Sequence, residues 1–568
     1  MGRLVDLEQT SLEVVRIGAL PVVNHYLARL DLERLMEEYV PADPRTTLSY
    51  ADVLCVVLCS LVVHRRPVYK IAEWMTARPP ALLGSCAAEA EDLNDDRVGR
   101  ALDALFRADR ASMLTKLMCQ AISVFEISCD ELHNDATTLS MQGDYDTSVG
   151  DSKRAPRVRF GHAKERPDLA QLIWLLTISS DGNVPITYRL ADGNTPEDPT
   201  HIATWTVCCV LAGCTTFLYV SDSKLCNRDA MGHIDKHHGR FLCVMPATRK
   251  EVEEFRRFIA TNTPTMTEAM RIPGRRKDDP FDVYHVTPAP SPSVEGYRVV
   301  WVHSSEKEAH DAEKRRRAIE KARVVIGELD EKLKGPRCRL RSKEAVETAG
   351  RAAIDEAGAS RWVTAAVLEE TVVSHKQQRR GRPGKNTAYV RVEQQRFSIN
   401  ASVADDVVRD DACFDGFWPM VTNDKEMTEV ELLYAMKRQP GVENRHHVFK
   451  GVVDFVPVYL KSNERIDAFA FLGYVALLLH ALIERDLRKA MRDQKVTELP
   501  LYPEGRACTA PTAARVIEVL EPLSAHELTA GDEVLRRYDP TLSPLHQQIL
   551  DLLGVPSTLY LTDRTTCV

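Results

Sequence analysis

The sequence predicts a mixed α/β protein whose core is preceded by an all-helical N-terminal region and interrupted by a large insertion. Three observations predict this class. Apolar residues recur at helical spacing up to about residue 120. Short apolar segments separated by turn signals then follow to about residue 250. A charged, helix-rich stretch breaks that series until about residue 425, where apolar helices resume.

Length and composition are those of a soluble globular protein with several domains. The chain has 568 residues, of which 44% are hydrophobic and 27% charged, and its net charge is -8. This charge argues against nucleic-acid binding by bulk attraction, although a local basic surface is enough for such binding. The 14 cysteines form no C-x-x-C pair. We therefore expect reduced thiols in a cytoplasmic protein rather than structural zinc.

No segment predicts a leader or a membrane span. The N-terminus, MGRLVDLEQT, carries acids and lacks an apolar core. The apolar runs Ala51–Val63 and Ala468–Ile483 are shorter than the roughly 18 to 20 residues that cross a bilayer. Both runs are expected to be buried helices, and no membrane partner is expected.

The first 120 residues predict helices only. Helical spacing covers Val14–Tyr26 and Leu30–Tyr39, and Ser49–Val63 predicts a central buried helix. Asn94, which precedes two acids, is the expected N-cap of a further helix. A helix-turn-helix pair can exist here, but no feature identifies it.

The next region predicts the element order β-β-β-α-β-α-β. Asp181-Gly182-Asn183 is a turn signal that makes a hairpin of the second and third strands. Periodicity by itself predicts no more than a mixed α/β core. The expected elements are Ile122–Cys129, Leu169–Ser179, Val184–Leu190, the helix Glu197–Leu211, Thr215–Val220, a short helix, and Arg240–Pro246.

The insertion combines extended segments with charged helices, and helices resume after it. From Thr428 one long helical pattern runs through Glu443 to about Lys450. A buried helix is then expected over Ala468–Met491, and the tail after Val496 is rich in proline. Within the insertion the expected elements are extended Tyr297–Val302 and Ala388–Ile399, and helical Glu306–Lys334 and Lys343–Ala357.

Three carboxylates stand out. Asp135 lies just past the first expected strand, Asp222 ends another, and Glu443 lies in a helix 221 positions later (443 minus 222). Two-metal phosphoryl chemistry needs oxygen ligands that converge from separate elements. A lone Asp at a strand end is more often a turn former. Asp130, five residues before Asp135, is an alternative first acid.

Longer stretches around these acids occur in a characteristic order. They are NDDRVGRALDALF (94–106), HNDATT (133–138), GHAKERPDLAQ (161–171), ADGNTPED (191–198), LYVSDSKL (218–225), DGFWPMVTND (415–424), YAMKRQPGVENRHHVFK (434–450) and FVPVYLKSNERIDAFAFLGYVALLL (455–479). In these blocks the chain resembles DDE transposases of insertion sequences, in particular the Tyr-Arg-Glu-Lys branch, which is the insertion-sequence four superfamily with its relatives.

The resemblance implies a fold and a domain plan. The fold is a ribonuclease-H-like catalytic core, a mixed sheet flanked by helices, with a large insertion before the helix that carries the glutamate. The implied segments are an N-terminal domain that binds DNA ends (1–120), the first part of the core (121–250), an insertion domain (251–425), the second part of the core (426–495) and a tail (496–568).

The resemblance also implies an activity and its catalytic residues. Carried over residue by residue, the catalytic and metal-binding acids are Asp135, Asp222 and Glu443, and Asp135 is preferred to Asp130 because Asp-x-Thr follows the strand. The implied cofactor is two Mg²⁺ ions, with Mn²⁺ as a substitute. The implied activity is binding of terminal inverted repeats, cleavage and strand transfer by a dimer or larger assembly on paired DNA ends. Second-strand cleavage through a hairpin is one route in this family.

Further residues are implied to bind DNA near the scissile phosphate. The signature Tyr falls on Tyr434 and the Lys on Lys450, while the Arg falls on either Lys437 or Arg438. The stretch before Glu443 is longer than usual and contains a proline, which predicts a kink. An aromatic ring there can stack on an unpaired base, and cations neutralise phosphate. Simple helix packing of Tyr434 is the alternative.

Cations cluster in the insertion. The run HKQQRRGRPGK (375–385) has five Lys or Arg and no acid, so Arg379, Arg380 and Arg382 are expected to bind DNA. Such a run suits an extended arm in a minor groove, and a solvated loop is the alternative.

Other functions remain open for the whole chain. One is a catalytically silent or domesticated DNA-binding protein, and another is a ribonuclease-H-like nuclease without strand transfer. A helical scaffold built on residues 306–357 explains none of the ordered blocks.

Overall fold

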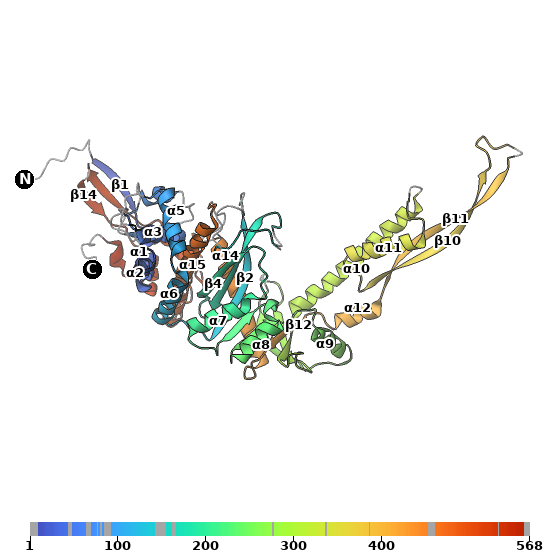
Figure 1. Ribbon diagram of the computed structural model, residues 1–568, viewed down its shortest axis with the longest axis horizontal. Helices are drawn as coiled ribbons and strands as arrows, with labels where there is room; N and C mark the ends of the chain where they lie inside the picture. The colour runs from blue at the N-terminus through green and yellow to red at the C-terminus, as the bar shows by residue number, and fades with distance from the viewer. Residues whose placement is uncertain are drawn as a thin grey trace, which may run out of the picture. The chain divides into compact units, whose positions relative to one another are not determined.

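The computed structural model describes a mixed α/β protein made of two compact units (Figure 1). The first unit joins Met1–Cys243 to Tyr434–Val568, and the second is Val244–Leu433. The predicted segments 1–120 and 496–568 both belong to the first unit. The structure describes all residues except 1–9, 42, 44–47, 64–69, 77, 80–81, 84–92, 143–154, 162–165, 275, 277, 336–337, 385–386, 452–459, 532 and 562–568.

A helical bundle in the first unit is built around one long helix, α15 (Asn463–Asp493). Its residues Ile466 to Arg485 are all buried, and it packs against α3, α5 and α17. Length and composition alone would let α15 cross a membrane, but its apolar window lies entirely inside the protein, as in a core helix. The other helices are α1 (Leu20–Arg29), α2 (Leu32–Tyr39), α3 (Tyr50–Val63), α4 (Ile71–Thr76), α5 (Asp95–Arg107), α6 (Arg110–Phe125), α16 (Ala513–Leu520) and α17 (Pro544–Leu553).

The expectation of an N-terminal region with helices only is wrong at its start. Residues Thr10–Arg16 form strand β1, which pairs antiparallel with β13 (Ser524–Ala530), and β14 (Glu533–Tyr538) completes a three-stranded sheet. The partner strand lies some 500 residues away in the sequence, so local periodicity could not reveal it. The predicted N-cap is confirmed, because the Asn94 side chain accepts a hydrogen bond from Arg97 N at 2.9 Å.

The main sheet of the first unit has the predicted order of elements. Its strands are hydrogen-bonded in the order β4-β3-β2-β5-β6; β2, β3 and β4 are antiparallel, whereas β2, β5 and β6 are parallel. The elements are β2 (Glu131–Met141), β3 (Ala170–Ser179), β4 (Pro185–Asp192), α7 (Thr200–Ala212), β5 (Leu218–Ser221), α8 (Arg228–Lys236) and β6 (Arg240–Val244).

Two predicted boundaries need correction. The segment Ile122–Cys129 is not a strand: its first residues finish helix α6, and β2 begins only at Glu131. The single helix predicted from Thr428 to Lys450 is broken into α13 (Glu429–Met436) and α14 (Pro440–Gly451). The break precedes Pro440, whose ring cannot follow a helical turn but fits the start of one.

Four stacked aromatic rings fix α14 and α15 to the sheet. Trp174 on β3 stacks on Phe449 of α14 at 4.2 Å between ring centroids, and on Tyr188 of β4 at 4.6 Å. Tyr188 in turn stacks on Tyr474 of α15 at 4.8 Å. Trp174, Phe449 and Tyr474 are buried and Tyr188 is half-buried, so this stack contributes both apolar burial and favourable ring contacts.

The second unit contains an antiparallel sheet and a long two-stranded ribbon. The sheet strands are ordered β12-β9-β8-β7. The ribbon pairs β10 (Val363–Gln377) with β11 (Tyr389–Val403), and α10 (Ser305–Lys334) and α11 (Lys343–Glu356) pack on it. The remaining elements are α9 (Lys250–Thr261), β7 (Thr267–Ile272), β8 (Asp282–Pro288), β9 (Arg298–Ser304), α12 (Asp405–Ala412) and β12 (Phe417–Thr422).

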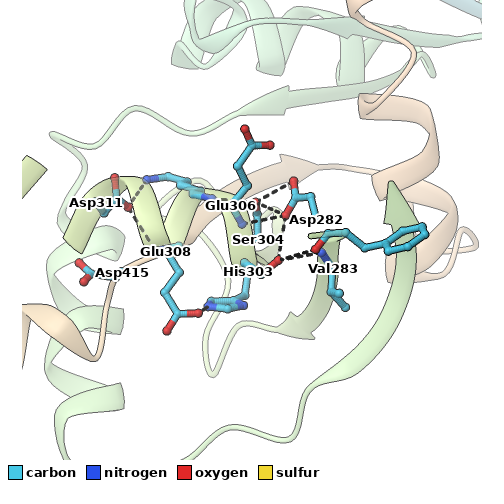
Figure 2. A network of polar contacts seen from close by, with 12 residues as sticks. Asp282, Val283, His303, Ser304, Glu306, Glu308, Asp311 and Asp415 are labelled. Atoms are coloured by element: carbon cyan, nitrogen blue, oxygen red, sulfur yellow. Dashed lines mark hydrogen bonds and ion pairs between the residues drawn. The ribbon is translucent and has the colours of Figure 1, made fainter. Parts of the chain in front are cut away.

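Helix α10 is tied to this sheet at its start (Figure 2). Asp282 accepts hydrogen bonds from Ser304 Oγ at 2.8 Å and from Glu306 N at 3.0 Å, so its carboxylate caps the helix. Further along, Arg315 makes a bidentate ion pair with Asp415 at 2.7 and 2.6 Å. These buried contacts hold α10 in one direction relative to the strands of its own unit.

Candidate catalytic carboxylate site

The register of two parallel strands brings Asp135 and Asp222 level with each other. His133 on β2 pairs with Val220 on β5, and the two aspartates each lie two residues further on. Between them, Ser221 Oγ donates a hydrogen bond to Asn134 O at 3.0 Å, which holds the strands together at this point. Residues at the same level of adjacent parallel strands point to the same face, so both carboxylates lie on one face of the sheet.

The position of Asp135 differs from the prediction in one respect. It was expected just past a strand, but β2 continues beyond it to Met141, so Asp135 lies inside the strand. Its rival Asp130 lies before β2, is exposed and accepts a hydrogen bond from Ser128 Oγ at 2.8 Å. The structure therefore brings Asp135, and not Asp130, level with Asp222.

The segment that carries Glu443 lies along one face of β2. Alternate residues of β2 contact it in order: Glu131 contacts Arg438, His133 contacts Gln439, Asp135 contacts His446 and Thr137 contacts Lys450. The distances are 2.5 Å from Arg438 Nε to Glu131 Oε1, 2.9 Å from His133 Nδ1 to Gln439 Oε1, 3.5 Å from His446 Nε2 to Asp135 Oδ2, and 2.7 Å from Lys450 Nζ to Thr137 Oγ1.

Glu443 belongs to the same helical face as His446. It lies in the first turn of α14, is exposed, and precedes His446 by three residues, which is one helical turn. His446 is buried and faces Asp135. The structure thus brings the helix of Glu443 to the strand of Asp135, on the face that also carries Asp222.

Buried polar contacts hold the start of α14. Arg445 donates to Asn183 O at 2.8 Å and to Gly182 O at 3.0 Å, both in the β3–β4 turn, and pairs with Glu484 of α15 at 2.7 Å. The turn itself needs positive φ at Gly182 and Asn183, as the sequence signal predicted. At Gly441, a Cβ atom would lie 2.5 Å from the Asn183 Oδ1 atom. This close approach favours glycine as the second residue of α14.

The site is strongly negative. Burial raises the pKa of Asp222, and the negative charge of Asp135 raises it further, against a hydrogen bond from Lys224 N. Burial together with the charges of Asp222 and Asp135 raises the pKa of Glu197. Negative charge gathered in this way favours an incoming cation, and oxygen donors suit Mg²⁺.

The donor set therefore fits a divalent ion in charge and chemistry. In the part of the chain that the structure describes, no three His, Cys, Asp or Glu side chains already form a group that could hold a metal ion. Glu443 would have to approach the two aspartates to complete such a group.

Glu197 is a residue that sequence reasoning missed. It belongs to the block ADGNTPED, where it was assigned no role, and it lies in the turn before α7. Its only signal in the sequence was membership of that block, because an acid near a helix start is normally explained by the helix dipole. In the structure its neighbours Asp222 and Asp135 mark it as a member of the acidic site.

The residues predicted to bind DNA fall into two groups. In the first group, which belongs to the unit of the carboxylates, Tyr434 has 47% of its surface exposed, Lys437 is half-buried, and Lys450 contacts Thr137 of β2. Arg438 is committed to a bidentate ion pair with Glu131 at 2.5 Å for both contacts. Arg379, Arg380 and Arg382 are exposed at the turn of the β10–β11 ribbon, in the other unit.

The Arg438–Glu131 pair changes the charge state of its carboxylate. Although burial acts against ionisation, hydrogen bonds from His133 and Arg438 lower the pKa of Glu131 to about 2. Glu131 is therefore ionised at neutral pH, and Arg438 anchors the segment before α14 to β2.

Comparison with known proteins does not show the family to which this chain belongs. A family model described as a domain of unknown function (DUF4277) matches residues 12–119, which is less than half of the chain. No curated protein matches. Among solved structures, a chain of the cryo-EM structure of the piggyBac transposase synaptic complex with hairpin DNA is similar at a TM-score of 0.37 and 8% identity, covering 83% of this chain and 77% of that one. A likeness at this level carries no argument about activity.

Proposed function

We propose that this protein is a DDE-type DNA transposase of an insertion sequence, which cleaves DNA at the ends of its element and joins them to a target. One observation carries the proposal: Asp135 on β2 lies level with Asp222, directly after the adjacent parallel strand β5, and the helix of Glu443 lies along that face of β2. The strand order β4-β3-β2-β5-β6 supports a ribonuclease-H-like core. The ordered sequence blocks favour the Tyr-Arg-Glu-Lys branch.

In this proposal Asp135, Asp222 and Glu443 would hold two Mg²⁺ ions, or Mn²⁺ in their place. Such ions activate the attacking oxygen and stabilise the leaving oxygen of a phosphoryl transfer. The rigid backbone of β2 and β5 fixes the two aspartates before DNA arrives. Glu197 adds negative charge beside them.

Residues around the carboxylates would position the DNA. The exposed ring of Tyr434 can stack on an unpaired base, and Lys450 can donate to a phosphate close to Thr137. We place the protein in the cytoplasm, bound to nucleoid DNA as a dimer or larger assembly on paired ends. Arg438 has a positioning role through Glu131 instead of a direct DNA contact.

The test is cleavage of DNA that carries the inverted repeats flanking the gene, with Mg²⁺ present. Asp222→Asn should abolish cleavage while end binding is retained. Asp130→Asn is the matched control, because it removes an exposed acid five residues from Asp135 and should leave cleavage unchanged. Full activity of Asp222→Asn, or loss of activity in Asp130→Asn alone, would overturn the site assignment.

The products decide the class of enzyme. Joining of 3′-hydroxyl ends to a target plasmid supports a transposase, whereas cleavage without joined products indicates a nuclease. Binding of the ends without any cleavage in the parent protein indicates a silent DNA-binding relative.

A further inference from the structure

The β10–β11 ribbon is supported along only half of its length. Its strands pair from Val363 with Val403 to Gln377 with Tyr389. The apolar core that joins it to α10 and α11 includes Val367 and Phe397, and among the described residues it receives no side chain from further along the ribbon. The outer part, called here the distal ribbon, is Glu369–Gln377 with Tyr389–Arg396 and the described residues 378–384 and 387–388 between them; Figure 1 shows strands β10 and β11 extending beyond both helices.

An isolated two-stranded hairpin is marginally stable in water. The distal ribbon nevertheless exposes apolar and aromatic side chains: Val373 is 43% exposed, Tyr389 52% and Val390 48%. By the strand register, Val373, His375, Arg391 and Tyr389 share one face. A partner that covers this face would stabilise the hairpin and would also shield the apolar side chains of that face from water.

The charge of the distal ribbon indicates which chemical class of partner it would bind. The sequence from Thr371 to Val392 contains six Lys or Arg and no acid. Arg379, Arg380 and Arg382 are exposed at the turn, and Lys376 is exposed just before it. Acids return only towards α10 and α11, at Glu369, Glu370 and Glu393, the last of which pairs with Arg391 at 2.7 Å. The positive charge at the tip favours a polyanion as partner. A second copy of the ribbon would carry the same positive charge and would be repelled.

The dimensions of the distal ribbon fit duplex DNA. Nine strand residues at about 3.3 Å each give the distal ribbon a length of roughly 30 Å. The major groove of B-DNA is about 12 Å wide and admits a two-stranded ribbon. Phosphates line both walls of that groove, where cations at a ribbon tip can reach them.

We propose that the distal ribbon is a DNA-binding arm that lies in the major groove, with Arg379, Arg380 and Arg382 on the phosphates. Buried contacts of α10 with Asp282 at its start (Figure 2) and with Asp415 further along give the arm a fixed base within its unit. The inference rests on the proposed function only in taking duplex DNA as partner. The arm uses no residue of the carboxylate site.

The test measures binding of the full chain to a mixed-sequence 40-base-pair duplex over a series of salt concentrations. Removing three phosphate contacts in R379A/R380A/R382A should make the slope of log K against log salt less steep by about 2.7. The matched control K314A/R316A/R317A removes three exposed cations from α10 and should keep the parent slope. Equal thermal unfolding of both variants establishes that they are folded.

A dimethyl sulfate footprint then identifies the groove. The parent should protect guanine N7 in the major groove, and R379A/R380A/R382A should lose that protection. Protection of adenine N3 alone would overturn the groove assignment, and an unchanged salt slope would overturn the arm itself. A change in oligomeric state at an unchanged slope would assign the ribbon to contact between copies of the chain.

The same assay separates this inference from the proposed function. Asp222→Asn should bind the duplex with the parent slope. If the parent never cleaves but its binding still depends on the three arginines, the proposed function fails and the arm stands. If cleavage depends on Asp222 while R379A/R380A/R382A keeps the parent salt slope, the inference about the arm is wrong and the proposed function is supported.

Discussion

Arg445 on α14 and Glu484 on α15 form a buried ion pair, with 2.7 Å between Nη1 and Oε2. The same guanidinium also donates to two carbonyl oxygens of the β3–β4 turn. One side chain therefore joins three elements of the first unit: the helix of Glu443, the central helix of the bundle and the hairpin of the main sheet.

Arg445→Met should destabilise the first unit by about 3 to 5 kcal/mol, because it leaves Glu484 charged and buried without its partner. Urea unfolding followed by circular dichroism measures this loss. Arg492→Met, which changes an exposed arginine on α15, the helix of Glu484, is the control and should shift the free energy of unfolding by less than about 0.5 kcal/mol. Equal values for the two variants would show that the ion pair contributes nothing.

Gly441→Ala should lower cleavage more than stability. The new Cβ atom would stand 2.5 Å from Asn183 Oδ1, so either the Asn183 side chain or the start of α14 must shift, and a shift of α14 would carry Glu443 with it. We expect at least a tenfold loss of kcat in the end-cleavage assay, with Mg²⁺ at saturation. Gly451→Ala, whose Cβ atom meets no atom of the described residues closer than 4.0 Å, is the matched control and should cleave like the parent. Parent-like activity of Gly441→Ala would mean that α14 tolerates the shift.

Glu197→Gln should weaken metal binding without removing it. The glutamate lies near Asp222 and Asp135 but is not one of the three proposed ligands. Loss of one negative charge should raise the Mg²⁺ concentration for half-maximal cleavage severalfold, and saturating Mg²⁺ should restore the parent rate. Asp198→Asn is the comparison, because Asp198 is exposed and has Lys224 at 3.9 Å. A rate that Mg²⁺ does not restore would instead make Glu197 a catalytic residue.

Mild acid should destabilise the protein through His480. Burial lowers the pKa of His480 to about 4, and its Nε2 lies 3.2 Å from Val62 O of α3. The unfolded chain takes up this proton below about pH 6.5 whereas the folded chain does not. The stability is therefore complete above pH 6.5 and falls as the pH drops from 6.5 towards 4.

The expected loss from His480 is about 2 kcal/mol between pH 7 and pH 5, measured by urea unfolding at both pH values. His480→Gln should show a smaller difference between the two pH values, because glutamine takes up no proton. Glu131 does not interfere, since its stabilising effect is lost only as the pH falls from its ordinary value near 4.5 towards about 2. Identical pH dependence in parent and variant would exclude His480 as the source.

Local sequence signals predicted much of the fold and part of the candidate site. The order of the core elements, the turn at Asp181–Asn183, the strand before Asp222 and the helical setting of Glu443 were all predictable, because each depends on residues close in sequence. The three acids as metal ligands stay a prediction. The assignment of Asp135 over Asp130 gained a structural argument only from the β2–β5 register.

What could not be predicted depends on distant partners. Strand β1 forms because Thr10–Arg16 meets β13, some 500 residues later. Glu197 joins the acidic site only because the turn before α7 folds back to β2 and β5. The role of Arg438 depends on Glu131, 307 residues away in the chain, and no local pattern pairs them.

The first unit is assembled from two stretches of sequence that are separated by residues 244–433. At about 5 to 20 residues per second, a ribosome needs roughly 10 to 40 s to synthesise those 190 residues (433 minus 244, plus 1). During that time a nascent chain has both aspartates but neither α14 nor α15, so Trp174 and Tyr188 lack the rings that later cover them. A chain cut short before residue 434 therefore exposes these aromatic rings to chaperones and proteases, and it lacks the third of the three acids in the proposed function.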